Sequence, residues 1–356
     1  MKIGFGSSDW SLTVKDQNRH PVWGGSGFIR LGQYAPLLRH DVVVGPLCWH
    51  DGVFGVKDWD GQIHLDCDIV VMQRVMFEDI PEKMNAAKAL GQVIVNDIDD
   101  WYWGLSPSNG AFAASHPKNN PKENTNHYRS ILARSTAVTT STRFLADKMT
   151  KWVGSDRVTI LPNCVKTEMF DQRVDSGSEV PTVGWVGSTA HRSGDLEILK
   201  GVIGPLADRG LIKIHHSGHL TQHPLFADRI GVDPSMVSTL PMAAPENYPS
   251  ILQFDIGLAP LSKMPFNRAK SAIKLLEYSA AGIPAVVSDL DAYVEAHNEY
   301  GLGFIAKNPS KWIKHIERLR NPEFRKEQGE LARANVAQCD VKFGAERMSS
   351  FYESLV

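Results

Sequence analysis

At 356 residues the chain is longer than a typical single domain of roughly 100–150 residues, so its length indicates about two domains. Hydrophobic residues make up 42% of the chain and charged residues 22%, which excludes disordered, collagen-like and coiled-coil proteins. The 38 basic and 40 acidic side chains give a net charge of −2, so nucleic acid is not an expected partner.

The start of the chain and its cysteines bear on its location. Met1–Asp9 reaches polar residues too early for the apolar region of a signal peptide. No run of about 18 apolar residues is present, so we expect no transmembrane segment. The four cysteines lie far apart, without a C-x-x-C pair, which is typical of reduced thiols. We therefore expect a cytoplasmic protein.

In the first half of the chain, short apolar runs rich in β-branched residues predict buried strands. They are Ile3–Phe5, Val42–Val44, Ile69–Met72, Val93–Val95, Val138–Thr140 and Val158–Leu161. Helical patterns, among them Pro81–Leu90 and Thr142–Val153, lie between several of these runs. Continuously apolar strands that alternate with helices predict a parallel sheet covered on both faces.

A polar segment, 171–180, then predicts a linker, and the alternation of strands and helices starts again after it. The strands predicted there are Val183–Val186, Leu211–His215, Val237–Leu240, Asp255–Ala259 and Ala285–Ser288. We predict an α/β fold with two tandem doubly wound, Rossmann-like domains, residues 1–170 and 181–340. Each domain would offer a ligand crevice at the carboxyl ends of its strands, and we expect the active site in the cleft between them.

A glycine-rich segment, Trp23–Phe28, precedes a helical pattern in the first domain. Glycines there let the backbone approach a ligand, and free amides at a helix start favour an anion. The spacing fits neither a dinucleotide fingerprint nor a P-loop. A plain helix entry after a surface loop explains the segment equally well.

Three carboxylates, Asp97, Asp99 and Asp100, follow a predicted strand. They could hold a divalent metal for a nucleotide diphosphate, because hard cations prefer carboxylate oxygens. They could also cap a helix, where acidic residues favour the helix dipole, or contact substrate hydroxyls without a metal. We favour the last two interpretations together.

The most informative segment is Pro265–Pro284, which predicts a helix beginning near Lys270. In such a helix Lys270, Lys274 and Glu277 share one face. Cations at a helix start, here Arg268 and the two lysines, oppose the helix dipole. A solvated basic face is the alternative, but three cations beside free amides make a strong diphosphate site. Glu277 could then accept hydrogen bonds from ribose hydroxyls.

The second domain opens with Gly184–Asp195, a predicted strand followed by a loop of small residues. Ser188, His191 and Arg192 in that loop could donate hydrogen bonds to phosphate oxygens. The alternative is a simple strand-to-helix turn with Asp195 at the start of the helix.

Several of these motifs together resemble a known family. They are Gly24–Gly27, Val138–Thr142, Leu161–Asn163, Asp255–Leu261, Asn267–Ser271, Lys274–Tyr278 and Gly282–Val287. The pattern is similar to GT-B fold glycosyltransferases, and most to their retaining, family-4-like group. The resemblance covers most of the chain, and its most specific part is 270–284.

The resemblance implies a role for each matching residue. Lys270, Arg192 and Asp97 would be catalytic, Glu277 would bind ribose, Met242 would lie against the base, and Gly25, Ser26 and Asp97 would face the sugar or acceptor. The donor diphosphate would be held by Ser188, His191, Arg192, Arg268, Lys270 and Ser271. The first domain would be the acceptor side, the second the donor side, and a last helix, 341–356, would pack back on the first domain.

The chain departs from the family pattern at two places. Eight residues before Glu277, where the family often has a carboxylate that contacts the transferred sugar, stands Ala269. The usual G-R…K-G loop is replaced by Gly187-Ser188…Ser193-Gly194. The sugar therefore cannot be carried over from the family, and a different set of cations must hold the diphosphate.

We predict a glycosyltransferase that moves a sugar from a nucleotide-diphosphate donor, UDP- or GDP-linked, to an acceptor hydroxyl. The resemblance implies retention of configuration, and the cations and amides imply no cofactor and no required metal. Three alternatives remain. One is a metal-dependent transferase that uses Asp97, Asp99 and Asp100; the others are a non-catalytic nucleotide- or sugar-binding protein and a nucleotide-sugar epimerase on the same fold.

Overall fold

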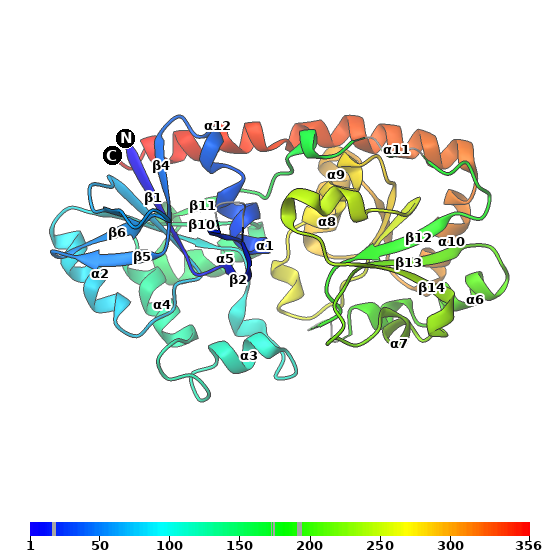
Figure 1. Ribbon diagram of the computed structural model, residues 1–356, viewed down its shortest axis with the longest axis horizontal. Helices are drawn as coiled ribbons and strands as arrows, with labels where there is room; N and C mark the ends of the chain where they lie inside the picture. Colours follow the sequence, from blue (N-terminus) through cyan, green and yellow to red (C-terminus); the bar gives the residue numbers. More distant parts are fainter. Residues whose placement is uncertain (16–18, 172, 174, 191–193) are drawn as a thin grey trace. The chain divides into compact units, whose positions relative to one another are not determined.

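The computed structural model describes residues 1–15, 19–171, 173, 175–190 and 194–356. The chain forms two compact units, and Figure 1 labels the helices and strands of each. The first unit consists of Met1–Cys164, Ala269–Ser271 and Val341–Val356. The second consists of Val165–Arg268 and Ala272–Asp340.

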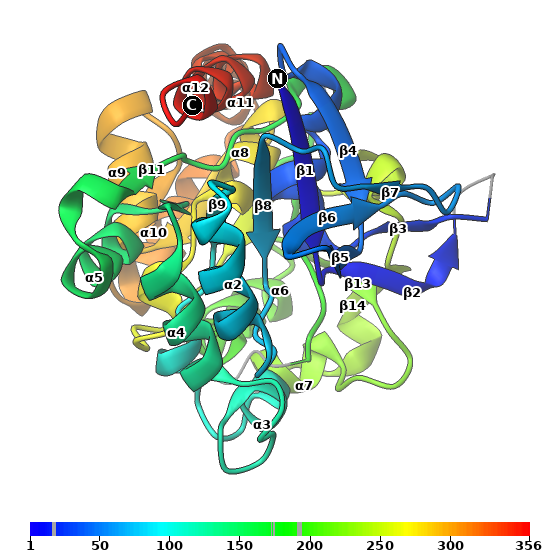
Figure 2. The same ribbon diagram turned by 90° about the vertical axis from the view of Figure 1, so that its left-hand side faces the viewer.

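Within the described part of the first unit, a six-stranded parallel sheet has the order β11-β10-β9-β8-β1-β4. The strands are β1 (Lys2–Ser7), β4 (Asp41–Gly45), β8 (Ile69–Gln73), β9 (Val93–Ile98), β10 (Ala137–Thr140) and β11 (Val158–Ile160). Figure 2 shows β1 and β8 side by side, with Ile3 in register with Ile69 and Phe5 with Val71. The predicted parallel sheet is confirmed.

Helices cover both faces of this sheet. They are α1 (Gly25–Gly27), α2 (Ile80–Ala89), α3 (Gly110–Ser115), α4 (Thr125–Arg134), α5 (Arg143–Val153) and α12 (Val341–Glu353). Although α12 comes from the end of the chain, it belongs to the first unit, where Met348 and Tyr352 join the buried cluster of Ile3 and Phe5. The rings of Phe5 and Tyr352 lie 6.4 Å apart.

Two small antiparallel sheets in the first unit were not predicted. One pairs β2 (Trp10–Lys15) with β3 (Pro21–Trp23), and the other has the order β5-β6-β7. The latter strands are β5 (Leu47–His50), β6 (Val53–Lys57) and β7 (Ile63–His64). Asp51 and Gly52, with φ values of 52° and 83°, connect β5 to β6. This is the left-handed geometry of a tight hairpin turn.

The described part of the second unit contains another six-stranded parallel sheet, with the order β14-β13-β12-β15-β16-β17. Its strands are β12 (Thr182–Val186), β13 (Lys213–His219), β14 (Val237–Pro241), β15 (Ile256–Ala259), β16 (Ala285–Ser288) and β17 (Phe304–Ala306). The helices are α6 (Ile203–Asp208), α7 (Phe226–Ile230), α8 (Ile273–Ala280), α9 (Asp291–Tyr300), α10 (Pro309–Leu319) and α11 (Pro322–Val336). The second predicted parallel sheet is also confirmed.

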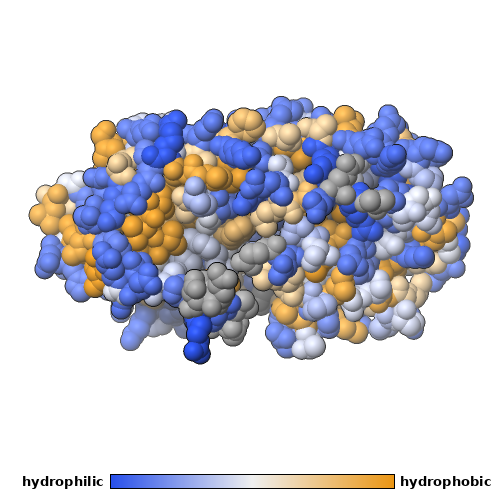
Figure 3. Space-filling model, turned by 45° about the horizontal axis from the view of Figure 1, so that its top comes forward, coloured by the Kyte–Doolittle hydropathy of each residue, from blue (hydrophilic) through white to orange (hydrophobic). Residues whose placement is uncertain are grey.

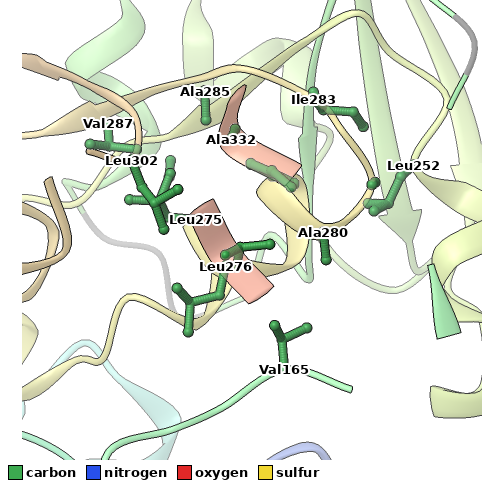
Figure 4. Packing of buried hydrophobic residues seen from close by; sticks show 14 of the residues in the cluster. Val165, Leu252, Leu275, Leu276, Ala280, Ile283, Ala285, Val287, Leu302 and Ala332 are labelled. Carbon is green, nitrogen blue, oxygen red and sulfur yellow. The ribbon is translucent and has the colours of Figure 1, made fainter. Parts of the chain in front are cut away.

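The core of the second unit fixes α8 in place. Figure 4 shows Leu275 and Leu276 of α8 among buried apolar side chains that include Ala332 of α11 and Val287 of β16. Removing a buried leucine side chain typically costs about 2–5 kcal/mol. The position of α8, and of the polar side chains it carries, is therefore strongly determined by packing.

The boundary between the units differs from the predicted linker. It lies between Cys164 and Val165, and the described residues of 171–180 belong to the second unit. Asp175 pairs with Arg325, whose side chain is completely buried, at 2.5 and 2.7 Å. A buried guanidinium needs a partner, so this polar segment has a structural role that its composition does not reveal.

The molecular surface is mixed in character. On the face drawn in Figure 3, small groups of apolar side chains are interrupted by polar ones. In the part of the chain that the structure describes, no helix has the length and apolarity needed to cross a membrane. All four cysteines are described, and all are free thiols.

Candidate functional site

At the carboxyl end of β12 in the second unit, the chain makes a turn that only glycine suits. Gly187 has a φ of 142°, and its N–H donates to the carbonyl of Ser217 at 2.8 Å. Its carbonyl accepts a hydrogen bond from His216 Nε2 at 2.9 Å. A Cβ at Gly218, whose φ is 94°, would lie 3.1 Å from the backbone of Gly187, so a side chain there would be strained and would require the neighbouring segment to shift. A rigid backbone loop results at the strand end, where α/β folds bind ligands.

Lys274, the second residue of α8, reaches this loop. Its Nζ donates to the carbonyl of Val186 at 2.6 Å and lies 5.7 Å from the ring centroid of Trp185. A Cβ at Gly187 would lie 3.5 Å from the same Nζ. The structure therefore places an ammonium group directly beside the glycine turn.

Glu277 lies one turn further along α8. Its Oε2 accepts a hydrogen bond of 2.7 Å from the hydroxyl of Tyr248. Burial raises the pKa of the Glu277 carboxyl, and the charge of Lys274 and the Tyr248 hydrogen bond oppose this rise. A half-buried carboxylate held in this way can still accept hydrogen bonds from hydroxyl groups of a ligand.

The predicted start of the helix was wrong by three residues. Helix α8 begins at Ile273, so Lys270 does not share a helical face with Lys274 and Glu277. A 3₁₀ turn over Asn267–Ala269 precedes it instead. Of the three residues, only Lys274 and Glu277 therefore share a helical face as predicted.

Lys270 and Ser271 pack with the first unit. Lys270 Nζ donates to Asp100 Oδ1 at 2.7 Å, and Ser271 Oγ accepts from Asn163 Nδ2 at 2.7 Å. Ala269, at the position where the family often has a carboxylate, is fully buried. A side chain at 269 thus has no open space into which it could present a charge.

Arg268 and Met242 lie on the surface of the second unit. The Arg268 guanidinium pairs with Asp291 at 3.0 Å, and both side chains are about half exposed, at 52% and 44%. Met242 is 39% exposed, and its N–H donates to the His219 carbonyl at 3.2 Å. The exposed ion pair favours the solvated interpretation of Arg268.

Asp195 has a role that sequence reasoning missed. Its Oδ1 accepts hydrogen bonds from Asn267 Nδ2 at 2.6 Å and from both the N–H and the hydroxyl of Ser262. Asp195 and Asn267 are both buried. Asp195 stands at the start of the following 3₁₀ helix, as in the predicted alternative, but its side chain makes no capping hydrogen bond there. Asp195 instead fixes the loop that leads into 267–271.

Ser188 lies in the loop after Gly187, as predicted, and its Oγ is 3.0 Å from His223 Nδ1. The N–H of Ala190 donates to the same hydroxyl at 3.2 Å. His191 and Arg192, the other predicted phosphate ligands, are outside the described residues.

The structure does not support a substrate contact by Asp97. This side chain is 1% exposed, and its two oxygens accept hydrogen bonds from Arg30 at 2.9 and 2.6 Å. Thr139 Oγ1 also donates to it at 2.7 Å. Asp97 forms a buried ion pair that joins β9 to the segment after α1. A sequence shows that a carboxylate lies near the end of a strand, but it does not show such a distant partner.

An ion-pair cluster around Arg74, at the carboxyl ends of the first sheet, was not predicted. Arg74 follows β8 and contacts Asp9 at 2.9 Å, Tyr102 Oη at 2.7 Å and Asp100 at 3.4 Å. Its φ of 59° is rare for a residue with a side chain and costs about 1–3 kcal/mol. Asp9 and Arg74 are polar residues that closely follow the ends of β1 and β8. Because parallel strands end at the same edge of a sheet, their positions in the sequence could have predicted this cluster.

The glycine-rich segment lies beside that cluster. Asp9 Oδ2 accepts the N–H of Gly27 at 2.6 Å, and its carbonyl accepts the N–H of Gly24 at 2.8 Å. Gly25 is exposed, and a Cβ added there would meet no atom within 4 Å. Ser26 hydrogen bonds to Asp99, whose pKa is raised by burial and by Asp100. The predicted Gly25 and Ser26 thus lie next to carboxylates, with open space at Gly25.

Asp97, near the end of β9, and Asp99 and Asp100, which follow it, do not form a metal site in the part of the chain that the structure describes. No group of three or more His, Cys, Asp or Glu side chains is arranged there to hold a metal ion. Asp97 pairs with Arg30, and Asp100 with Lys270 and Arg74. Asp97 and Asp100 therefore neutralise nearby cations and do not share a metal ion.

His216 below the glycine turn gives a prediction about pH. Its Nε2 must carry the proton donated to the Gly187 carbonyl, and its buried Nδ1 has no partner among the described residues. Burial lowers the pKa of His216 to about 4, helped by the nearby His219, His215 and Lys274 and opposed by the Gly187 hydrogen bond. In the unfolded chain His216 binds a proton below its ordinary pKa of 6.5. In the folded protein it stays neutral until the pH approaches 4. Stability is therefore complete above pH 6.5 and falls as the pH drops toward 4, by about 3 kcal/mol.

The test is urea unfolding between pH 4.5 and 7.5. His216→Gln keeps a hydrogen-bond donor and should lose most of this pH dependence relative to the wild type. His50→Gln, which changes an exposed histidine of the first unit, should keep the wild-type slope. Identical slopes for the wild type and His216→Gln would contradict the assignment.

Comparison of the sequence with known proteins finds a partial relative. The chain is 24% identical over 211 residues to TuaH of Bacillus subtilis strain 168, a protein named as a teichuronic acid biosynthesis glycosyltransferase. The match covers 53% of this chain and 49% of TuaH, so the chain spans about half of that relative. No family model matches the sequence.

Solved structures are similar over most of the chain. Sucrose-phosphate synthase from Thermosynechococcus elongatus has a TM-score of 0.66 at 14% identity, over 99% of this chain and 98% of that one. Anabaena HepE in complex with UDP has a TM-score of 0.64 at 13% identity, over 99% and 100%. A glycosyltransferase from Rickettsia africae has a TM-score of 0.60 at 15% identity, over 82% and 77%. With its two parallel-sheet, Rossmann-like units, the chain has the GT-B fold of glycosyltransferases.

Proposed function

We propose that the protein is a glycosyltransferase that uses a nucleotide-diphosphate sugar, with UDP as the first candidate nucleotide. The observation that carries the proposal is the group formed by the Gly187 turn, Lys274 and Glu277 in the second unit. A backbone loop with an adjacent ammonium suits a diphosphate, and a carboxylate one turn away suits ribose hydroxyls. The similarity to HepE, which was solved with UDP and with UDP-glucose, supports the choice of nucleotide.

In the proposed reaction the bond between the sugar C1 and the diphosphate oxygen breaks. A new bond forms between C1 and the acceptor oxygen, and the hydroxyl proton leaves to the diphosphate. Lys274 and the amides after Gly187 would stabilise the charge that develops on the departing diphosphate. We further propose that configuration is retained and that these groups act without a required metal. GDP-linked donors are the next class to test.

A panel of nucleotides tests this proposal by thermal shift. We expect UDP at about a hundred times its Kd to stabilise the protein by about 2.7 kcal/mol, which raises Tm by about 5–10 °C. GDP, ADP and dTDP should give smaller shifts, and EDTA should leave the UDP shift unchanged. Glu277→Ala should lose most of it, because the ribose contact is removed.

Each other outcome has a definite meaning. A shift seen only with Mg²⁺ would contradict metal independence and favour a metal-assisted site at Asp99 and Asp100. No shift with any nucleotide would overturn the proposed donor site. Conversion of a UDP-sugar without an acceptor, with no release of UDP, would show an epimerase in place of a transferase.

A further inference from the structure

The first unit contains an open pocket of about 380 Å³ that the donor site does not use. Its walls come from the end of β1, the β4–β5 connection, the β5–β6 hairpin and the segment between β8 and α2, all of which are visible in Figure 2. Its volume falls within the range of roughly 300–1,000 Å³ that is usual for small-molecule sites. The pocket also lies at the carboxyl ends of parallel strands, where α/β folds bind ligands.

The walls of this pocket are mainly apolar. They include side chains from three separate parts of the first unit, namely Leu47, Trp49, Phe54, Val75, Phe77 and Ile80. Phe77 is 41% exposed, although the main chain of its segment is held by hydrogen bonds to the neighbouring loop. An aromatic side chain that stays exposed in a formed pocket gains most from an apolar ligand that covers it.

The charges in the pocket neutralise each other. Lys83 Nζ pairs with Asp79 Oδ2 at 2.5 Å, one helical turn earlier on α2. The same Nζ lies 6.0 Å from the ring centroid of Trp49. An anionic ligand would have to compete with Asp79 for the ammonium, so a neutral ligand fits this lining better than a phosphorylated one.

Hydrogen bonds connect the polar end of the pocket to the glycine-rich segment of the first unit. Ser7 and Ser8 line it, and Ser7 Oγ accepts the N–H of Asp9 at 2.9 Å. Asp9 in turn binds the Gly27 amide and Arg74. A ligand with an apolar part in the pocket and a hydroxyl at its polar end would therefore present that hydroxyl near Asp9.

We propose that this pocket holds an apolar group, aromatic or aliphatic, of the acceptor whose hydroxyl receives the sugar. The proposal rests on the glycosyltransferase function proposed above and adds the chemical class of the acceptor. Trp49 and Phe77 cover the apolar group, and the hydroxyl points to the Ser7–Asp9 end.

The test measures binding without any nucleotide, so its result is independent of the donor site. The probes are methyl, n-hexyl and p-nitrophenyl β-D-glucopyranoside, which differ only in the group attached to the sugar. By calorimetric titration we expect the hexyl and nitrophenyl compounds to bind at least tenfold more tightly than the methyl compound. Phe77→Ser should weaken their binding at least fivefold. Leu90→Ser, which changes a 63% exposed apolar residue outside the pocket, should leave it unchanged.

Cys48 gives a second readout in the unaltered protein. It lines the pocket and is partly exposed, whereas the other three cysteines are buried. The nitrophenyl compound should slow alkylation of Cys48 by N-ethylmaleimide, as measured by mass spectrometry of the peptides. Equal binding of all three glucosides, equal binding in Phe77→Ser and wild type, or unprotected Cys48 at a saturating probe concentration would each overturn the proposal. A normal UDP shift in the same preparation would show that such a failure concerns the acceptor pocket alone.

Discussion

Lys274→Ala is expected to lower kcat/KM for the nucleotide-sugar donor by about 100- to 1,000-fold, the usual effect of removing one preorganised group that stabilises developing charge. Lys274 Nζ lies beside the Gly187 turn and donates to the Val186 carbonyl at 2.6 Å. A cation in the first turn of α8 opposes the helix dipole, so its presence is not explained by helix stability. We therefore expect the variant to stay within about 1 kcal/mol of the wild type in unfolding free energy.

Arg268→Ala is the matched control for this experiment. Arg268 is a nearby cation of the same basic segment, but its ion pair with Asp291 is exposed. The control should retain kcat/KM within about threefold, since exposed ion pairs contribute little. The measurement is the initial rate of nucleoside diphosphate release with the donor identified by the nucleotide panel. Equal losses in the two variants would show that general positive charge, and not the position of Lys274, governs the rate.

The sheets of this fold could be predicted from the sequence because their strands are apolar on both faces. Runs such as Ile69–Met72 and Ala285–Ser288 leave little choice but a buried parallel strand. The β5–β6 hairpin was also predictable, since Asp51-Gly52 between two apolar runs is a strong signal for a tight turn.

The start of α8 could not be predicted, because distant residues determine it. Lys270 and Ser271 have reasonable helix propensities, but Lys270 binds Asp100 and Ser271 binds Asn163. Asn267 is held by Asp195, 72 residues earlier in the chain. Such long-range contacts override local helix propensity. The helical pattern therefore predicted that α8 exists, but not the residue at which it begins.

The fate of Asp97 illustrates the same difficulty for a candidate site. A carboxylate at the end of a buried strand is equally compatible with a ligand contact and with a buried ion pair. Its partner, Arg30, lies 67 residues away in a segment whose pattern gave no sign of a buried cation. Residue type and strand position therefore predicted that Asp97 lies near the carboxyl end of a strand, but not that it forms a buried ion pair.

Asp97→Ala should consequently act on stability, with an expected loss of about 3–5 kcal/mol, because it leaves the Arg30 guanidinium buried without its counter-ion. Arg30 is 1% exposed and also donates to the Leu161 carbonyl at 2.6 Å and to Asn163 Oδ1 at 2.7 Å. Urea unfolding followed by tryptophan fluorescence measures the loss. Asp66→Ala, which breaks the exposed ion pair with Lys2 in the same unit, should change the unfolding free energy far less than Asp97→Ala does.

A double variant separates a structural role of Asp97 from a catalytic one. Arg30→Met with Asp97→Leu removes both buried charges, so it should recover part of the stability that Asp97→Ala loses. The recovery should be incomplete, because the Leu161 carbonyl and Thr139 hydroxyl lose their buried partners. If the folded double variant turns over donor at a rate close to that of the wild type, Asp97 acts only through the fold. A rate lowered at least a hundredfold in a variant of near-normal stability would instead place Asp97 in the catalytic machinery, as the resemblance first implied.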